Sequence, residues 1–496
     1  MLVMEKFSSF DFHHKSGVLM PLFSLPSPYG IGTFGKPCKD FVDFLAKCGQ
    51  KCWQVLPLCP TAYGDSPYQS PSTFAGNPYF LDLDDFVSRG LLTKKETETC
   101  LAPQGKVDYG KLWETRFDVL RLAHSRFVSD DSYRAFCDKN AAWLDDYALF
   151  FALKSANEFR AWTEWSDEFK TYASAKKLAA KLSSQTDFWK WVQFEFDSQW
   201  QKVRDYANER GIQLVGDLPI YVALDSADVW SRPSDFLLDE HFVPTVVAGC
   251  PPDDFATEGQ LWGNPIYDWA KMEKDGFAWW LARFKRCFEL YDVVRVDHFR
   301  GFAGYYAIPQ GKSAKDGSWQ KGYGRQLFDA LNKALPNARI IAEDLGFITD
   351  DVRDLLAHTG YAGMKVLQFA FDDASSDYLP SNFQTSNCVV YTGTHDSECT
   401  ASWAKKLVGK RKALFERECA PRDGESATWA LARAAMESKA NLAVVPLWDF
   451  AELPDEVARI NVPAVSEGNW TWRAERLDDE LACKILRLTE QTGRLV

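Results

Sequence analysis

Three short apolar runs of the chain each end on a carboxylate that is followed by a loop. The carboxylates are Asp297, Glu343 and Asp396. Catalytic groups of a parallel barrel come from the carboxyl ends of several strands, so we expect these acids to converge on one mouth. Facing carboxylates with few other reactive groups suit chemistry at a glycosidic bond.

Arg295 precedes Asp297 by two residues in the same predicted strand. Side chains alternate along a strand, so the two should point the same way. A guanidinium beside a carboxylate favours the ionised form, which suits a nucleophile. The alternative is a structural ion pair that fills the barrel. The adjacent His298 and the turn at Gly301 favour the functional interpretation.

Glu343 ends the apolar run that contains Ile341 and Ala342. A carboxyl group among apolar neighbours keeps its proton more easily, as a general acid must. The next residue, Asp344, should face the opposite side and is a candidate cap of the following helix. The residues alone do not decide which of the two is the acid.

Two further strand-end acids are ambiguous. Asp396 follows His395, and such a pair near a helix start is more often a cap than a catalytic group. Asp217 ends another apolar run and carries the same ambiguity.

Several aromatic residues stand in loops that are rich in turn-forming residues. Tyr63 and Tyr68 lie in one such loop and Trp262 in another, outside any obvious core stripe. Flat aromatic faces offer the apolar faces of sugars a rigid surface. Most of the 19 tryptophans are nevertheless expected to be core residues.

Strand-like and helix-like segments alternate along the chain, which predicts an α/β architecture. Most predicted strands are continuous apolar runs, as in parallel strands buried on both faces. They are residues 16–22, 51–56, 79–83, 212–218, 291–296, 338–342, 364–369, 388–391 and 441–445. Between them, a stripe from Phe188 to Val203 has helical spacing. Eight strands would form a (β/α)8 TIM barrel with helical and irregular insertions around its C-terminal face.

We interpret residues 1–496 as a single catalytic barrel with two insertions. Residues 86–210 are predicted to form a helical insertion subdomain. Residues 231–269 are rich in Pro, Gly and Asp without a clear period. We predict that they form an irregular loop insertion over the active-site cleft.

The composition argues against several classes of protein. A net charge of −12 disfavours a nucleic-acid partner. The start of the chain has no signal-peptide core, and no run is apolar enough for a membrane helix, so we expect a cytoplasmic location. The twelve cysteines lack the spacing of zinc ligands and are expected to be free thiols. We expect neither a metal nor a cofactor.

An ordered set of motifs extends over nearly the whole chain. The segments are residues 24–32, 53–58, 64–70, 75–79, 216–222, 251–255, 259–265, 295–298, 342–346, 363–369, 394–396 and 469–473. Together they resemble the 4-α-glucanotransferases, the amylomaltase or disproportionating-enzyme family, which is glycoside hydrolase family 77. The resemblance implies retaining transfer of α-1,4-glucan segments between maltooligosaccharides or to glucose, through a covalent intermediate on an aspartate.

The resemblance also implies a role for individual residues. Asp297 would be the nucleophile, Glu343 the acid/base and Asp396 the stabiliser of the transition state. The residues implied around the reacting glucose are Asp217, Arg295, His298 and His395. The remaining substrate-binding positions that it implies are Tyr68, Asp254, Gln260, Trp262 and Asn469.

The chain departs from the usual family pattern outside the catalytic positions. Cys59 and Ala62 stand where glycines are usual, Cys250 replaces a valine or similar residue, Trp448 replaces a glutamine, and Ala464-Val465 replace Gly-Thr. We expect these departures to leave the activity intact. They leave the chain-length preference and the outer subsites open.

Two alternatives to a transferase stand beside this interpretation. A hydrolase of the α-amylase kind would use the same residues with water as the acceptor. A glycan-binding protein without catalysis would not require an acid/base pair, so the three carboxylates count against it.

Overall fold

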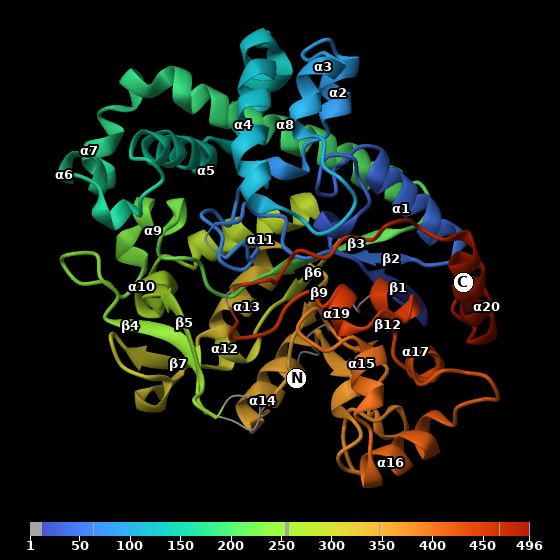
Figure 1. Cartoon of the computed structure of the whole chain (residues 1–496). Helices are drawn as coiled ribbons and strands as arrows, with labels where there is room; N and C mark the ends of the chain where they lie inside the picture. Colours follow the sequence, from blue (N-terminus) through green and yellow to red (C-terminus); the bar gives the residue numbers. More distant parts are fainter. Residues whose placement is uncertain (1–11, 63, 253–256, 347, 466, 496) are drawn as a thin grey trace.

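The computed structural model describes residues 12–62, 64–252, 257–346, 348–465 and 467–495. Within these residues, eight parallel strands close into a barrel in the ring order β1-β2-β3-β6-β9-β10-β11-β12 (Figure 1). They are β1 (Lys15–Leu19), β2 (Cys52–Gln54), β3 (Gln213–Leu218), β6 (Val293–Val296), β9 (Ile340–Ala342), β10 (Ala362–Val366), β11 (Cys388–Tyr391) and β12 (Leu442–Pro446). The predicted TIM barrel is confirmed.

The barrel strands form because their apolar runs are buried on both faces. Every residue of β6 is buried, and so is every residue of β9, β11 and β12. The register pairs Asp217 with Arg295 and Val296 with Ala342, so neighbouring strands end at one rim. That rim receives the residues that follow each strand.

Helices surround the barrel after the strands (Figure 1). They include α1 (Lys36–Lys47), α10 (Trp269–Lys274), α11 (Ala278–Leu290), α12 (Arg300–Ala303), α13 (Gly324–Ala334), α14 (Asp350–Thr359), α15 (Thr400–Lys405), α16 (Gly409–Cys419), α17 (Ala427–Glu437), α18 (Leu447–Phe450), α19 (Asp455–Ala458) and α20 (Asp479–Gln491). The amphipathic α13 buries Leu327, Phe328 and Leu331. This apolar face of α13 is stable only when it packs against the barrel.

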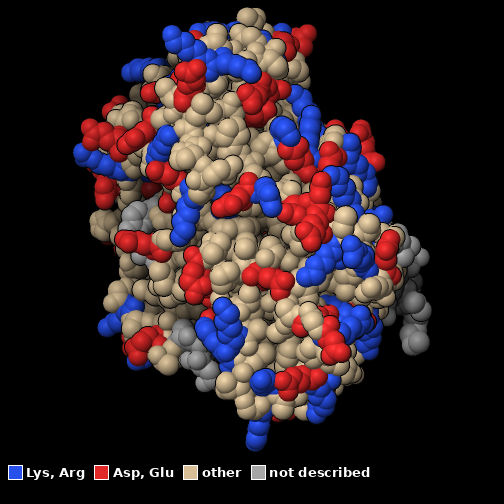
Figure 2. Space-filling view, turned by 45° about the vertical axis from the view of Figure 1, so that its right-hand side comes forward, with Lys and Arg blue, Asp and Glu red and all other residues tan. Residues whose placement is uncertain are grey.

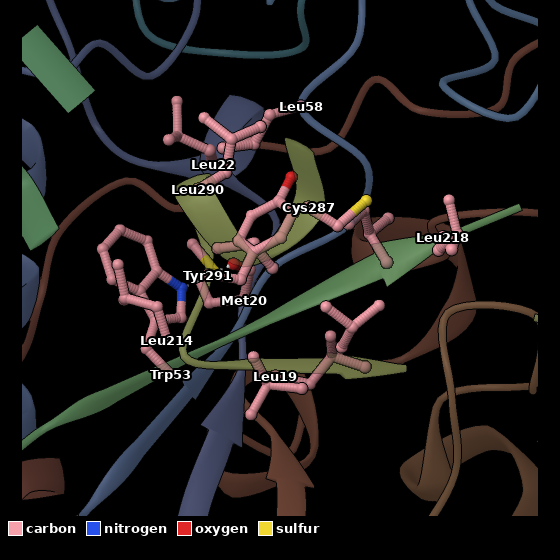
Figure 3. Packing of buried hydrophobic residues seen from close by; sticks show 14 of the residues in the cluster. Leu19, Met20, Leu22, Trp53, Leu58, Leu214, Leu218, Cys287, Leu290 and Tyr291 are labelled. Atoms are coloured by element: carbon pink, nitrogen blue, oxygen red, sulfur yellow. Dashed lines mark hydrogen bonds between the residues drawn. The ribbon is translucent and has the colours of Figure 1, made fainter. Parts of the chain in front are cut away.

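Part of the core packs around the start of β6. Figure 3 shows Tyr291 among Trp53, Leu214 and Leu290, which come from β2, β3 and α11. A Cβ atom at Gly216 would lie 2.1 Å from the Tyr291 ring. Only glycine therefore lets this ring pack against β3, one residue before Asp217.

One predicted strand, 79–83, is wrong. The chain forms a 3₁₀ turn at Pro78–Phe80 and then α2 (Leu83–Ser88). The Asn77 side chain accepts the Tyr79 N–H, and the Asp82 side chain accepts the Asp84 N–H. These side-chain caps provide hydrogen-bond acceptors for the local backbone N–H groups, and they outweigh the tendency of the apolar run to form a strand.

The connection between β2 and β3 is helical over most of its length (Figure 1). Its further helices are α3 (Lys94–Thr97), α4 (Tyr109–Arg126), α5 (Asp131–Ala156), α6 (Asp167–Lys170), α7 (Tyr172–Lys176) and α8 (Ser183–Asn208). The stripe predicted from Phe188 to Val203 is confirmed, because its residues are buried on α8. The Trp200 indole donates to Leu290 O at 2.9 Å, which ties α8 to the barrel helix α11.

The prediction that residues 231–269 are irregular is wrong. The helix α9 (Ala227–Ser231) ends where the segment begins, and the segment itself contains β4 (Val246–Cys250) and β5 (Gln260–Pro265). With β7 (Gly304–Pro309) and β8 (Ser318–Lys321) they form an antiparallel sheet in the order β5-β4-β7-β8. The register shifts between Val247 and Gly249, and a Cβ at Gly249 would lie 2.1 Å from Gln260 O. This bulge breaks the alternation that marks a strand in sequence.

The surface mixes charges of both signs. Acidic and basic side chains are interspersed over the face that Figure 2 shows. All twelve cysteines are free thiols, and eight of them are buried. In the part of the chain that the structure describes, no helix is both long and apolar enough to span a bilayer.

Candidate active site

The carboxyl ends of β3, β6, β9 and β11 meet at one rim of the barrel. Backbone hydrogen bonds continue beyond the strands there. Asp297 N donates to Leu218 O, and Glu343 N donates to Val296 O, each at 3.0 Å. Asp297, Glu343 and Asp396 line one cleft with a volume of about 350 Å³. The structure thus brings the three strand-end acids together.

Arg295 links two of the acids. Its Nη1 lies 2.7 and 2.8 Å from the two carboxylate oxygens of Asp217, and 2.9 Å from Oδ1 of Asp297. Burial opposes the charge of Arg295, but Asp217 and Asp297 outweigh burial and hold the pKa of Arg295 above the ordinary arginine value. Asp297 therefore has a permanent counter-ion.

Asp217 lies beneath the cleft. Its side chain is 0% exposed, and its Oδ2 also accepts the Tyr68 hydroxyl at 2.7 Å. Neither Asp217 nor Arg295 belongs to the residues that line the cleft. Their contact with the reacting glucose, which the family resemblance implies, therefore stays a prediction. They hold Tyr68 and Asp297 from below.

Glu343 is a half-buried acid of the cleft. Burial raises its pKa to about 8, and Asp297 adds to the rise, whereas Arg295 and two backbone N–H groups oppose it. Those N–H groups belong to His298, at 2.7 Å from Oε2, and Leu345, at 3.0 Å from Oε1. At neutral pH Glu343 keeps its proton, as a general acid must.

Asp344 points away from the cleft, as alternation along the strand requires. Its Oδ1 accepts the Met364 N–H of β10 at 2.7 Å. It does not cap the following helix, because the N-cap of α14 is Thr349. The capping expectation is wrong, and of the two neighbours only Glu343 faces the cleft.

His298 shapes the turn after Asp297. Its φ of +48° lies in the left-handed region, which side chains other than glycine rarely adopt. This turn aims the His298 N–H at Glu343. Burial lowers the pKa of the imidazole to about 4, so the ring is neutral at pH 7. Its edge meets the Trp262 ring at a centroid distance of 4.9 Å.

Tyr68 and His395 form one wall of the cleft. Their rings stack at a centroid distance of 5.2 Å with planes 14° apart. Trp470 lies 5.7 Å from Tyr68 and 6.0 Å from His395. Burial and the nearby Asp217 hold the pKa of Tyr68 well above its ordinary value, so the phenol remains a donor.

Asp396 is the most accessible of the three acids, with 45% of its side chain exposed. Asn461 Nδ2 donates to its Oδ1 at 2.6 Å, and His395 Nε2 lies 3.3 Å from Oδ2. It does not cap α15, whose N-cap is Cys399. The capping alternative for Asp396 is therefore wrong.

The opposite wall comes from β5. Gln260 and Trp262 line the cleft, and the indole N–H donates to Gln260 Oε1 at 3.0 Å. Asn264 exchanges two amide hydrogen bonds with Gln69, of 3.0 and 3.2 Å. This exchange fastens β5 to the loop that carries Tyr68.

Two sequence-predicted residues lie outside the described residues, and Asn469, like Asp217 and Arg295, lies outside the cleft lining. Asp254 and Tyr63 belong to the first group. Asn469 does not line the cleft; its amide bonds to the backbone of Val462 and Val465. Asn469 therefore shapes the loop that presents Asn461 and Ala464.

Sequence reasoning missed several residues of the site, among them Gln69, Asn264, Asn461 and Trp470. Gln69, Asn264 and Trp470 stand inside the family motifs, but Asn461 carries no local signal. Only its contact with Asp396, 65 positions earlier, identifies it.

The departures from the family pattern occupy varied places. Ala464 lines the cleft with a φ of +65°, a conformation that favours the usual glycine. Trp448 is buried against Trp472 at a centroid distance of 5.9 Å. Cys59 donates weakly to Thr73 O at 3.8 Å. Of these three residues, only Ala464 touches the cleft.

The described residues contain no group of three or more His, Cys, Asp or Glu side chains placed to hold a metal ion. The cleft instead offers an aspartate with a permanent counter-ion and a protonated glutamate. A parallel barrel with two such carboxyl groups at its C-terminal mouth has the architecture of an enzyme that acts on glycosidic bonds.

Comparisons with known proteins give the family. The family model described as 4-alpha-glucanotransferase, glycosyl hydrolase family 77, matches residues 20–478. A 4-alpha-glucanotransferase of Clostridium butyricum is 45% identical over 96% of this chain and 100% of its own length. One of Thermus thermophilus is 42% identical over 97% of this chain and 99% of its own. The chain belongs to glycoside hydrolase family 77, and its activity is that of the family, 4-alpha-glucanotransferase.

A solved structure shows the same architecture. The amylomaltase of Streptococcus agalactiae, crystallised in complex with acarbose, superposes with a TM-score of 0.93 at 37% identity. The match covers 97% of this chain and 99% of that one. The family acts on α-1,4-glucans, which are the substrate class of this enzyme.

Proposed function

We propose that the cleft transfers α-1,4-glucan segments with retention, with Asp297 as the nucleophile and Glu343 as the acid/base. The observation that carries the proposal is the contrast between the two carboxyl groups. Asp297 lies 2.9 Å from a permanent cation, whereas Glu343 bonds to backbone N–H groups and its surroundings raise its pKa to about 8. Two carboxyl groups in opposite protonation states are what a double displacement needs.

In the first step, Asp297 attacks the anomeric carbon while Glu343 gives its proton to the glycosidic oxygen. The bond between that carbon and that oxygen breaks, and the reducing-end fragment leaves with a new 4-hydroxyl. A glycosyl ester on Asp297 remains, and Glu343 is now a carboxylate. Two inversions at the same carbon give net retention.

In the second step, the 4-hydroxyl of a maltooligosaccharide or of glucose gives its proton to Glu343. Its oxygen attacks the anomeric carbon, and the Asp297 carboxylate leaves. The two backbone N–H groups on Glu343 stabilise the carboxylate between the steps. The same group therefore serves as acid and then as base.

We assign Asp396 to hold sugar hydroxyls in the transition state. Its exposure and its bond from Asn461 support this role, because the fixed carboxylate can still accept from a ligand. The neutral imidazole of His298 and the indole of Trp262 would contact sugar rings beside the reacting bond. The acarbose bound by the S. agalactiae amylomaltase supports sugar binding in this cleft.

We also propose that the segment 231–269 covers the cleft and that the helices within 86–210 form an insertion subdomain of the barrel. Gln260 and Trp262 support the first assignment, because they line the cleft with Asp297. A cytoplasmic location stays a prediction from the sequence, to be tested by cell fractionation.

The test is incubation with maltotriose alone, followed by sizing of the products. Transfer should yield glucose and a ladder of longer oligomers while the total of reducing ends stays nearly constant. A steady rise in reducing ends without longer products would instead favour hydrolysis.

A further inference from the structure

A second hollow lies at the opposite end of the barrel, where the strands begin. Its volume is about 740 Å³, against about 350 Å³ for the active-site cleft. Lys15 and Gln213 are the first residues of β1 and β3. Lys51, Asp292 and Arg339 each stand at or just before the start of β2, β6 and β9. The hollow therefore belongs to the barrel and not to a surface loop.

The lining of this hollow is cationic in an acidic protein. The lining holds four cationic side chains, Lys15, Lys51, Arg204 and Arg339, and one carboxylate, Asp292. The whole chain carries −12. This gathering of positive charge is opposite in sign to the protein that surrounds it.

The single carboxylate is already paired. Arg204 Nη2 and Nε lie 2.8 and 3.1 Å from Asp292 Oδ1, and Asp292 Oδ2 accepts the Leu214 N–H at 2.8 Å. Among the residues that the structure describes, neither Lys15 nor Lys51 forms an ion pair with a carboxylate. Two ammonium groups of the hollow thus have their charge available to a ligand.

The cations stand on rigid backbone. Lys15 N donates to Asn441 O and Lys51 N donates to Ser16 O, both at 2.9 Å. Val294 N donates to Arg339 O at 3.0 Å. These bonds belong to the barrel ladder, and the three side chains are half-buried. Cations on fixed elements lose less entropy when they bind a ligand.

The other lining groups suit an organic phosphate. Gln213 and Asn337 offer amides for hydroxyl groups, and Phe288 and Tyr291 offer apolar surface. Ammonium and guanidinium groups are the preferred partners of phosphate oxygens. We propose that this hollow binds a small anion that carries one or more phosphate groups.

The position of the hollow separates this binding from the chemistry. β3, β6 and β9 begin at the hollow and end near Asp217, Asp297 and Glu343. A strand of four residues spans about 13 Å. An anion bound at the hollow would therefore contact the strands of the active site without touching the substrate.

The experiment is isothermal titration of the full-length protein with inorganic pyrophosphate, inorganic phosphate and a hexose monophosphate, at constant ionic strength. The wild type should bind pyrophosphate more tightly than phosphate, because pyrophosphate carries more charge. A hexose monophosphate that binds more tightly than phosphate would identify an organic ester as the ligand. Pyrophosphate carries no sugar, so Asp297→Asn should bind it as the wild type does, whatever the outcome for catalysis.

Variants locate the binding. The double variant Lys15→Gln with Lys51→Gln should lower the affinity for pyrophosphate at least about tenfold, which corresponds to about 1.4 kcal/mol of binding free energy. Lys15→Arg combined with Lys51→Arg should retain binding, and this pair also guards against misfolding of the Gln variant. The control pair Lys177→Gln with Lys181→Gln removes two exposed charges from the helical region and should bind within about twofold of the wild type. Equal binding by the wild type and the Lys15/Lys51→Gln variant, or no binding by the wild type, would overturn the proposal.

Discussion

The floor of the active-site cleft and its walls are built differently. The floor consists of Asp217, Arg295 and Asp297, joined by charge-assisted bonds of 2.7–2.9 Å, and of Glu343, which accepts two backbone N–H groups. The walls include Tyr68, Gln69, Asn264, His395 and Trp470, joined by amide pairs and ring contacts. Charges fixed on a barrel determine the chemistry, whereas rings and amides on loops determine which sugar is held.

Removal of the nucleophile should give the largest effect. Asp297→Asn should lower the rate of glucose release from maltotriose by a factor on the order of 10⁴ or more, as loss of a nucleophile does in other enzymes. Arg295 keeps Asp217 as its partner, so the fold should survive. Asp350→Asn, at an exposed helix start, is the matched control and should keep the wild-type rate. An active Asp297→Asn enzyme would place the nucleophile elsewhere.

The protonation of Glu343 predicts the alkaline limb of the pH profile. Burial raises its pKa to about 8, and the first step needs the protonated form. kcat/KM should therefore fall as the pH rises through about 8, approaching tenfold per pH unit above that value. The measurement is the initial rate with maltotriose across the alkaline range.

A donor with a good leaving group provides the control for that limb. A maltosyl fluoride needs no proton on its leaving group, so formation of the glycosyl ester should not fall with the same pKa. If the rates with both donors fall at the same pH, the alkaline fall is caused by unfolding or by the titration of a group other than Glu343.

The walls should matter less for rate and more for partner choice. Trp262→Ala removes the ring that meets His298 but leaves every floor carboxylate in place. Stacking of a nucleic-acid base on an aromatic side chain contributes about 1–3 kcal/mol of binding free energy. We expect the contact between a sugar face and the Trp262 ring to contribute an amount near the lower value. We expect a rate about tenfold lower and a larger hydrolytic fraction, because a loosely held acceptor competes less well with water.

The ratio of transfer to hydrolysis decides this point. Val243→Ala, an exposed apolar residue outside the cleft lining, is the control and should leave the ratio unchanged. A Trp262→Ala enzyme with the wild-type rate and ratio would make the ring part of the scaffold.

The smallest effect should come from Ala464. Its left-handed backbone conformation costs a residue with a Cβ atom about 1–2 kcal/mol, and a glycine would remove this strain. Glycine also has more conformational freedom in the unfolded chain, which offsets part of the gain in stability. Ala464→Gly should change the free energy of unfolding by less than about 1 kcal/mol, in the stabilising direction. Val465→Gly, next to it and without a positive φ, should be neutral or destabilising. Chemical denaturation of both variants measures the difference, and a marked loss of stability in Ala464→Gly would contradict the assignment.

The strand-end acids and the loop aromatics Tyr68 and Trp262 were predictable from sequence, whereas the amide partners in the walls were not. A barrel strand is an apolar run, so the positions of Asp297 and Glu343 at strand ends follow from local pattern. The bond from Asn461 to Asp396 joins residues 65 positions apart and leaves no periodic signal. The partners of Asp217 were not predictable either, because its bonds with Arg295 and Tyr68 join different elements of the chain.

The same distinction holds for the fold. Eight barrel strands and the α8 stripe follow from runs and periods of apolar residues. The sheet β5-β4-β7-β8 was missed because a bulge at Gly249 and the neighbouring prolines interrupt the alternation. The error at 79–83 has a local cause, since Asn77 and Asp82 capture backbone N–H groups that a strand would use.

The central claim is that Asp297 carries the sugar and that Glu343 moves the proton. The most direct test is intact-protein mass spectrometry of Glu343→Gln after reaction with maltosyl fluoride, followed by peptide mapping. The first step should proceed without the acid, and the ester should accumulate because no base activates the acceptor. The account predicts one added maltosyl group, located on Asp297. An adduct on Asp344 or Asp396, or no adduct in an otherwise folded protein, would contradict it.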